Sequence, residues 1–84
     1  MNIENLIVDN QVLRSIDHAR EVFAEGRKRK MYVYHTGSLP GDRILNTRLD
    51  RLAKFLLLKS ELGNCNLFQQ RVANSKSFYY ICQY

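Results

Sequence analysis

Two histidines and two cysteines are the side chains best suited to nucleophilic or metal chemistry, and their spacing favours neither. They are His18, His35, Cys65 and Cys82, separated by 17, 30 and 17 positions. Zinc ligands usually come in close pairs along a chain, so this spacing predicts no metal site. A cysteine nucleophile needs a histidine within hydrogen-bonding reach, and nothing in the sequence places either sulfur near His35. We therefore expect no catalytic residue and no cofactor, and we predict that the protein is not an enzyme.

The segment from His35 to Arg43 is the other place where chemistry could concentrate. It contains two glycines and the single proline of the chain, so it is expected to form a loop that leads into a helix. Backbone amides at that helix start, together with Ser38 and Arg43, could hold an anion. The segment lacks the Gly-Lys-Ser/Thr sequence of a phosphate-binding loop. A structural turn is therefore the interpretation that we favour.

Five elements are expected to position these side chains, in the order α-β-α-β-β. A first helix, capped by Asp9 or Asn10, ends at Gly26. Its apolar stripe consists of Val12, Leu13, Ile16, Ala19 and Phe23. β-branched and aromatic residues predict a strand over 31–36. A second helix runs from Asp42 or Thr47 to Glu61.

Two further strands are expected at 66–72 and 77–83, joined by a hairpin loop over 73–76. The chain is then one α+β domain over 1–84, with an acidic helix over 1–26 and a basic β-α-β-β unit over 31–84. A three-stranded, mostly antiparallel sheet forms if the third strand lies between the other two. Both helices are expected to cover one face of it, with a right-handed crossover.

The charge distribution and the apolar runs limit the class of protein. The 84 residues carry a net charge of +5. Residues 1–25 hold five carboxylates against two arginines, whereas the rest of the chain is strongly basic. A basic balance permits nucleic acid or an acidic protein surface as a partner. We expect no membrane span and no signal peptide, and hence a cytoplasmic protein with reduced thiols.

The second helix carries apolar residues on two faces, whereas packing on a single core needs only one. The expected core stripe consists of Leu45, Leu49, Leu52, Ala53 and Leu56. The second face lies roughly 130° round the helix and consists of Arg51, Phe55, Leu58 and Leu62, bordered by Arg48 and Lys59. Either the helix is central and covered on both sides, or these exposed leucines have no role, or the face binds another protein or a second copy.

In the third case, a protein-binding site comprises Arg48, Arg51, Phe55, Leu58 and Lys59. Apolar anchors beside arginines are typical of interface hot spots. A homodimer through the second helix is a further alternative that the same face permits.

Helices on one face of the sheet leave the other face open, and strand alternation suggests an aromatic platform there. Its residues are Tyr32, Tyr34, Tyr79, Gln69 and Arg71. Single-stranded nucleic acids bind such surfaces by base stacking. A basic cluster would contact phosphates and consists of Arg27, Lys28, Arg29 and Lys30. Tyrosines are also ordinary strand residues, so a purely structural role is the alternative.

A series of landmarks covers roughly residues 32–81: Tyr34-His35-Thr36-Gly37, Asp42-Arg43, Leu49-Asp50-Arg51-Leu52-Ala53, Gly63, Leu67-Phe68-Gln69-Gln70-Arg71 and Phe78-Tyr79-Tyr80-Ile81. The pattern resembles short phage, prophage or mobile-element proteins of unknown function. The resemblance carries no catalytic residues and implies a host-cell context. Small non-enzymatic proteins of that context often inhibit a host machine by occupying its surface.

The function that we expect is therefore a small non-enzymatic accessory protein that binds and inhibits a host protein or a protein–nucleic-acid complex. The two alternatives are a module that binds single-stranded nucleic acid and a structural homodimer subunit.

Overall fold

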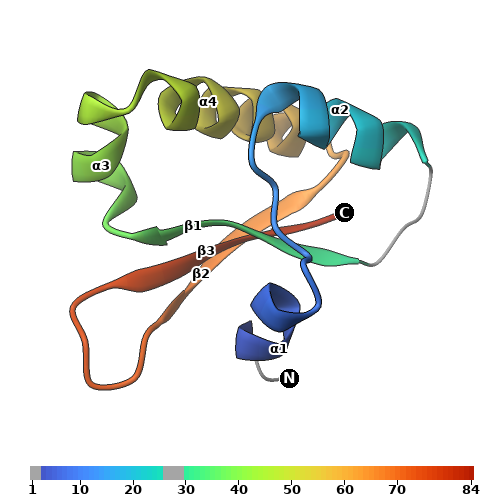
Figure 1. Cartoon of the computed structure of the whole chain (residues 1–84). Helices are drawn as coiled ribbons and strands as arrows, with labels where there is room; N and C mark the ends of the chain where they lie inside the picture. The colour runs from blue at the N-terminus through green and yellow to red at the C-terminus, as the bar shows by residue number, and fades with distance from the viewer. Residues whose placement is uncertain (1–2, 26–29) are drawn as a thin grey trace.

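A computed structural model describes residues 3–25 and 30–84 of the chain (Figure 1). Within these ranges it contains four helices and three strands. In chain order they are α1 (Ile3–Val8), α2 (Ile16–Ala24), β1 (Met31–Gly37), α3 (Leu39–Leu45), α4 (Thr47–Glu61), β2 (Asn66–Arg71) and β3 (Phe78–Gln83). The predicted α+β class is confirmed. The second predicted helix is divided into α3 and α4, and α1 lies before the predicted cap of the first.

The three strands form one sheet in the order β1-β3-β2, with β3 antiparallel to both neighbours. The central place of the third strand is therefore confirmed. The pairing of β1 with β3 is irregular between Val33 and His35, so that Val33 faces Ile81 whereas His35 already faces Tyr80. This bulge brings the His35 ring onto the side of the sheet that carries Tyr80, with ring centroids 6.0 Å apart.

Helices lie on both faces of the sheet (Figure 1). α2 and α4 cover one face, where the main core includes Leu13, Leu52, Leu56 and Cys82. α1 lies on the opposite face, and a second, smaller core there consists of Ile3, Leu6, Val33 and Ile81. One face of the sheet is predicted to stay open. That prediction is wrong where α1 covers this face.

The predicted first helix is wrong in its first half, because the segment between α1 and α2 pairs with β1. Val12 forms a parallel bridge with Val33, and Asn10 adopts a positive φ of 60°. α2 begins only after Ser15, whose Oγ accepts a hydrogen bond from the His18 N–H at 3.1 Å. A side-chain cap of this kind satisfies a backbone donor that the first turn leaves without a partner.

The second predicted helix is interrupted at Asn46, which adopts an extended conformation between α3 and α4. The Asn46 Oδ1 accepts a hydrogen bond from the Leu49 N–H at 3.1 Å, so Asn46 caps α4. The break turns Leu45 out of the core, and its side chain is 92% exposed. The rest of the predicted core stripe is confirmed, since Leu49, Leu52, Ala53 and Leu56 are all buried. Within the described residues, no helix is both long and apolar enough to cross a bilayer.

Candidate functional site

The aromatic residue predicted to anchor a partner, Phe55, is partly buried within the chain itself. Its ring stacks on Phe23 of α2, with centroids 6.0 Å apart, and Phe23 stacks in turn on Tyr84 at 4.5 Å. The guanidinium of Arg20 and the ammonium of Lys59 lie 5.7 Å and 5.5 Å from the centre of the Phe55 ring. Such cation–π contacts hold charge against an aromatic face. Phe55 therefore fastens α4 to α2, as expected for a helix that is partly covered by its neighbour.

The remainder of the second apolar face of α4 is not covered. Leu58 is 54% exposed and Leu62 is 63% exposed. Arg48 and Arg51 are exposed on the same side of the helix, and Lys59 is half-buried beside Phe55. We call Arg51, Leu58 and Leu62 the outer strip of α4. Of the three explanations for the second apolar face, coverage by the chain's own elements holds for Phe55. It does not hold for the outer strip, which no described residue covers.

The predicted aromatic platform does not form, because its tyrosines lie on different faces. Tyr32 and Tyr34 are both 8% exposed and belong to the core beneath α2 and α4. Tyr79 packs on the opposite face, against the core that α1 covers. Strand alternation correctly places Tyr32 and Tyr34 on the same side as each other, but that side is the covered one. Bases cannot stack on rings that helices already cover.

Of the predicted basic contacts, Arg71 and Lys30 lie in the described part of the chain, whereas Arg27, Lys28 and Arg29 lie outside it. Arg71 is exposed, and its Nε donates a hydrogen bond to the Ser75 carbonyl oxygen at 2.8 Å. It thereby braces the hairpin between β2 and β3. Lys30 accepts a hydrogen bond at its carbonyl oxygen from the Tyr84 N–H, which extends the pairing of β1 and β3.

The loop between β1 and α3 is closed by a carboxylate of the chain itself. Asp42 Oδ2 lies 2.7 Å from His35 Nε2 and accepts a hydrogen bond from the Ser38 N–H at 3.0 Å. These two contacts, that of His35 first, lower the pKa of the Asp42 carboxyl. A Cβ atom added at Gly37 would lie 2.5 Å from the same oxygen. The position where an external anion was considered is therefore filled, which supports the structural turn.

Arg43 is also engaged inside the chain. Its Nε donates to Asp50 Oδ1 at 2.7 Å, and the Lys54 ammonium lies 3.1 Å from Asp50 Oδ2. Arg43, followed by Lys54, lowers the pKa of the Asp50 carboxyl. The pair joins α3 to α4 across the break at Asn46. We conclude that Arg43 positions α3, and that its Nε is engaged by Asp50 rather than by an anion in the loop.

The two cysteines are free thiols and both are buried. Cys65 Sγ donates to the Leu56 carbonyl oxygen at 3.7 Å. Burial raises the pKa of both thiols, so they are poor nucleophiles at neutral pH. In the described part of the chain, no three His, Cys, Asp or Glu side chains are grouped to hold a metal ion.

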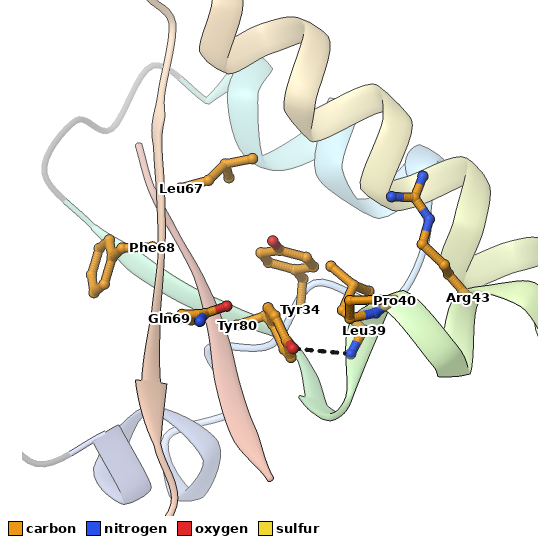
Figure 2. Close-up of a pocket in the computed structure, with 8 residues that line it drawn as sticks. All are labelled: Tyr34, Leu39, Pro40, Arg43, Leu67, Phe68, Gln69 and Tyr80. Carbon is orange, nitrogen blue, oxygen red and sulfur yellow. Dashed lines mark hydrogen bonds between the residues drawn. The ribbon is translucent and has the colours of Figure 1, made fainter. Parts of the chain in front are cut away.

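A surface hollow beside β2 escaped the sequence reasoning (Figure 2). Its volume is about 630 Å³. Its lining comprises Tyr34, Leu39, Pro40, Arg43, Leu67, Phe68, Gln69 and Tyr80. The Tyr80 hydroxyl accepts a hydrogen bond from the Leu39 N–H at 3.0 Å, which holds α3 over the sheet. Figure 2 shows Leu67 and Tyr34 pointing into the space, whereas the Phe68 ring points away from it.

The hollow lies beside a strand that is exposed along most of its length, because five of the six residues of β2 are exposed. The sequence contained one signal for this feature. A sheet with its third strand in the centre makes the second strand an edge, and edge strands present backbone groups to solvent.

In comparisons with known proteins, no family model, no curated protein and no solved structure matches the chain.

Proposed function

We propose that this chain is a small non-catalytic protein-binding module that acts by occupying the surface of a partner protein. The observation that carries the proposal is the outer strip of α4. Leu58 and Leu62 are both more than half exposed and lie one helical turn apart. Large apolar side chains that gather on one face, rather than being scattered singly, are typical of interaction sites.

The surroundings of the strip support a protein as the partner. Arg51 lies within it and Arg48 borders it, and both side chains are exposed. Arginine is enriched in interfaces because its planar guanidinium both packs and forms paired hydrogen bonds. With a net charge of +5, the chain suits a partner whose surface is acidic. Inhibition of a host machine by surface occupancy, as implied by the phage-type resemblance, is consistent with such a site.

Nucleic acid is the weaker candidate. Its proposed stacking surface depended on Tyr32 and Tyr34, and these rings are buried beneath the helices. What is left of that proposal is positive charge alone, which supports only non-specific and strongly salt-dependent binding.

The test is a capture experiment with a matched pair of variants. Tagged wild-type protein, Leu58→Glu and Leu45→Glu are incubated with extract of the natural host, with and without nuclease treatment, and any captured protein is purified and titrated directly. Leu45 is the control because its side chain is 92% exposed on α3, away from the strip. We expect Leu58→Glu to weaken binding at least tenfold, about 1.4 kcal/mol, and Leu45→Glu to leave it unchanged. Capture that disappears with nuclease treatment, or equal affinity for both variants, contradicts the proposal.

A further inference from the structure

The two outer edges of the sheet are unequal. On β1, the Val33 N–H donates to the Gln11 carbonyl oxygen at 3.0 Å, and the Val33 carbonyl oxygen accepts from the Leu13 N–H at 2.9 Å. The segment before α2 is therefore bonded to the middle of that edge. Among residues 3–25 and 30–84, no segment pairs with the outer edge of β2. β2 is thus a six-residue strand with one side available for backbone hydrogen bonds.

Two hydrogen-bonding observations establish which groups of β2 face outward. The Val72 N–H donates to the Ser77 carbonyl oxygen at 2.9 Å, in the same register as β2 and β3. Because bonded and non-bonded pairs alternate in an antiparallel ladder, positions 66, 68 and 70 bond to β3. The bonds that Val33 makes with Gln11 and Leu13 lead to the same assignment. Because Val33 directs its backbone groups away from β3, its neighbour Ile81 bonds on the other side, to Phe68 of β2. Leu67, Gln69 and Arg71 consequently direct their N–H and C=O groups away from the sheet.

We propose that a second copy of this chain pairs with β2 in an antiparallel arrangement, about a two-fold axis at Gln69. In this register Gln69 faces the partner's Gln69. Leu67 faces the partner's Arg71, and Arg71 faces the partner's Leu67. These three pairs use every outward N–H and C=O of β2, two hydrogen bonds to each pair. The two sheets then join into one continuous sheet of six strands. The proposal does not depend on the outer strip of α4, which lies elsewhere on the chain.

The side chains of β2 suit this register. On the side of the sheet that carries the hollow, the two Gln69 amides face each other and can exchange hydrogen bonds. On the other side Phe68, which is 40% exposed, faces the partner's Gln70 and lies diagonal to the partner's Phe68. Aromatic rings reach each other across such diagonals. The strand carries one charge, Arg71 at its end, so no like charges face each other directly.

β2 also lacks the devices that keep an edge strand apart from others. It contains no proline, no lysine and no irregularity in its pairing with β3. Leu57 adds an apolar contact beside the strand. It is 50% exposed and lies about 200° round α4 from Phe55, which contacts α2, so it lies on the flank away from α2. α4 contacts β2, and we therefore expect Leu57 to contribute to the interface between the two copies.

Size and charge set the strength of the dimer. One strand with Leu57 and Phe68 buries less than the ~800 Å² per partner of a standard interface, so we expect a dissociation constant in the micromolar range. Each copy carries a net charge of +5, and the two copies repel each other. Added salt screens this repulsion and is expected to strengthen the dimer. An acidic peptide bound at the same edge would respond in the opposite sense.

The experiment is sedimentation velocity across the micromolar range for wild-type protein, Gln69→Lys, Gln69→Glu and an equimolar mixture of the two variants. Ala73→Lys, in the exposed hairpin loop, controls for added charge, and Leu58→Glu controls for association through α4. Thermal melts verify that each variant is folded. The dissociation constant of the dimer should be at least about fivefold higher for each Gln69 variant than for wild type, because like charges then face each other at the axis. The mixture should recover the dimer.

Recovery in the mixture supports the axis at Gln69, because it requires the two positions to face each other. A wild-type protein that stays monomeric throughout overturns the proposal. So does a dimer that both Gln69 variants leave unchanged, and so does one that only Leu58→Glu disrupts. A loss of partner capture by Leu58→Glu with dimerisation intact would bear on the proposed function alone.

Discussion

The rings of Phe55 and Phe23 stack with centroids 6.0 Å apart and planes inclined by 23°. This contact joins α4 to α2, and Tyr84 extends it to the end of the chain by stacking on Phe23 and donating its hydroxyl to the Phe23 carbonyl oxygen. Phe55, which the sequence predicts as an anchor for a partner, is thus used for internal packing. The neighbouring Leu58 is more than half exposed and does not take part in this packing.

Replacing Phe55 by alanine is expected to lower the free energy of unfolding by about 2 kcal/mol, because a partly buried ring and its stacking contact are lost. Leu58→Ala, one turn further along α4, should change stability by less than about 0.5 kcal/mol, since Leu58 is more than half exposed. Urea denaturation of both variants measures the difference. Equal losses would mean that Leu58 is buried in the folded protein.

Gly37→Ala is expected to destabilise the chain by about 1–3 kcal/mol. Gly37 has a φ of 139°, and an added Cβ would lie 2.5 Å from Asp42 Oδ2 and 3.2 Å from His35 Nε2. The added methyl group would displace the carboxylate that closes the loop. Gly41→Ala is the matched control, because the residue is helical and, apart from its chain neighbours and the backbone of its own helix, nothing lies within 4 Å of its added Cβ. Thermal denaturation should show Gly41→Ala at or above wild-type stability, and a fall as large as that of Gly37→Ala would argue against this account of the loop.

The stability of the fold should decrease in alkali through Tyr34. Burial raises the pKa of Tyr34 from 10.0 to about 12. The neutral phenol is therefore favoured in the folded state, and its contribution is complete below pH 10 and lost as the pH rises through 12. Tyr34→Phe cannot ionise, so the wild type should lose stability relative to this variant between these two pH values. Urea titrations at several pH values measure the free energy of unfolding of both proteins. An equal change with pH in the wild type and in Tyr34→Phe would contradict the prediction.

The three strands and their places along the chain could be predicted from the sequence because they depend on local signals. Glycines, hairpin residues and β-branched runs mark the strands at 31–36, 66–72 and 77–83, close to the observed bounds. Alternation also assigns Tyr32 and Tyr34 to one side of β1. It cannot say which side the helices cover. Here the tyrosine side is covered by α2 and α4, whose residues pack on Tyr32 and Tyr34 from distant parts of the chain.

The breaks in both predicted helices depend on contacts that local periodicity does not contain. Val12 fits a helical stripe, but in the fold it pairs with Val33, 21 positions along the chain. Asn46 ends one helix and caps the next, and the ion pair between Arg43 and Asp50 then spans the break. The candidate site was found only in part for the same reason. Leu58 and Arg51 are exposed as expected, whereas Phe55 and Arg43 are engaged by elements that the sequence could not place.

The hydrogen bonds that Gln11 and Leu13 make with Val33 also determine how far self-association can proceed. A three-stranded sheet with both margins bare could recruit copy after copy and grow into a fibril. Here the chain's own N-terminal segment is bonded to the middle of one margin, at Val33. Joining two molecules through the other margin leaves only these bridged margins on the outside, which opposes the addition of further copies.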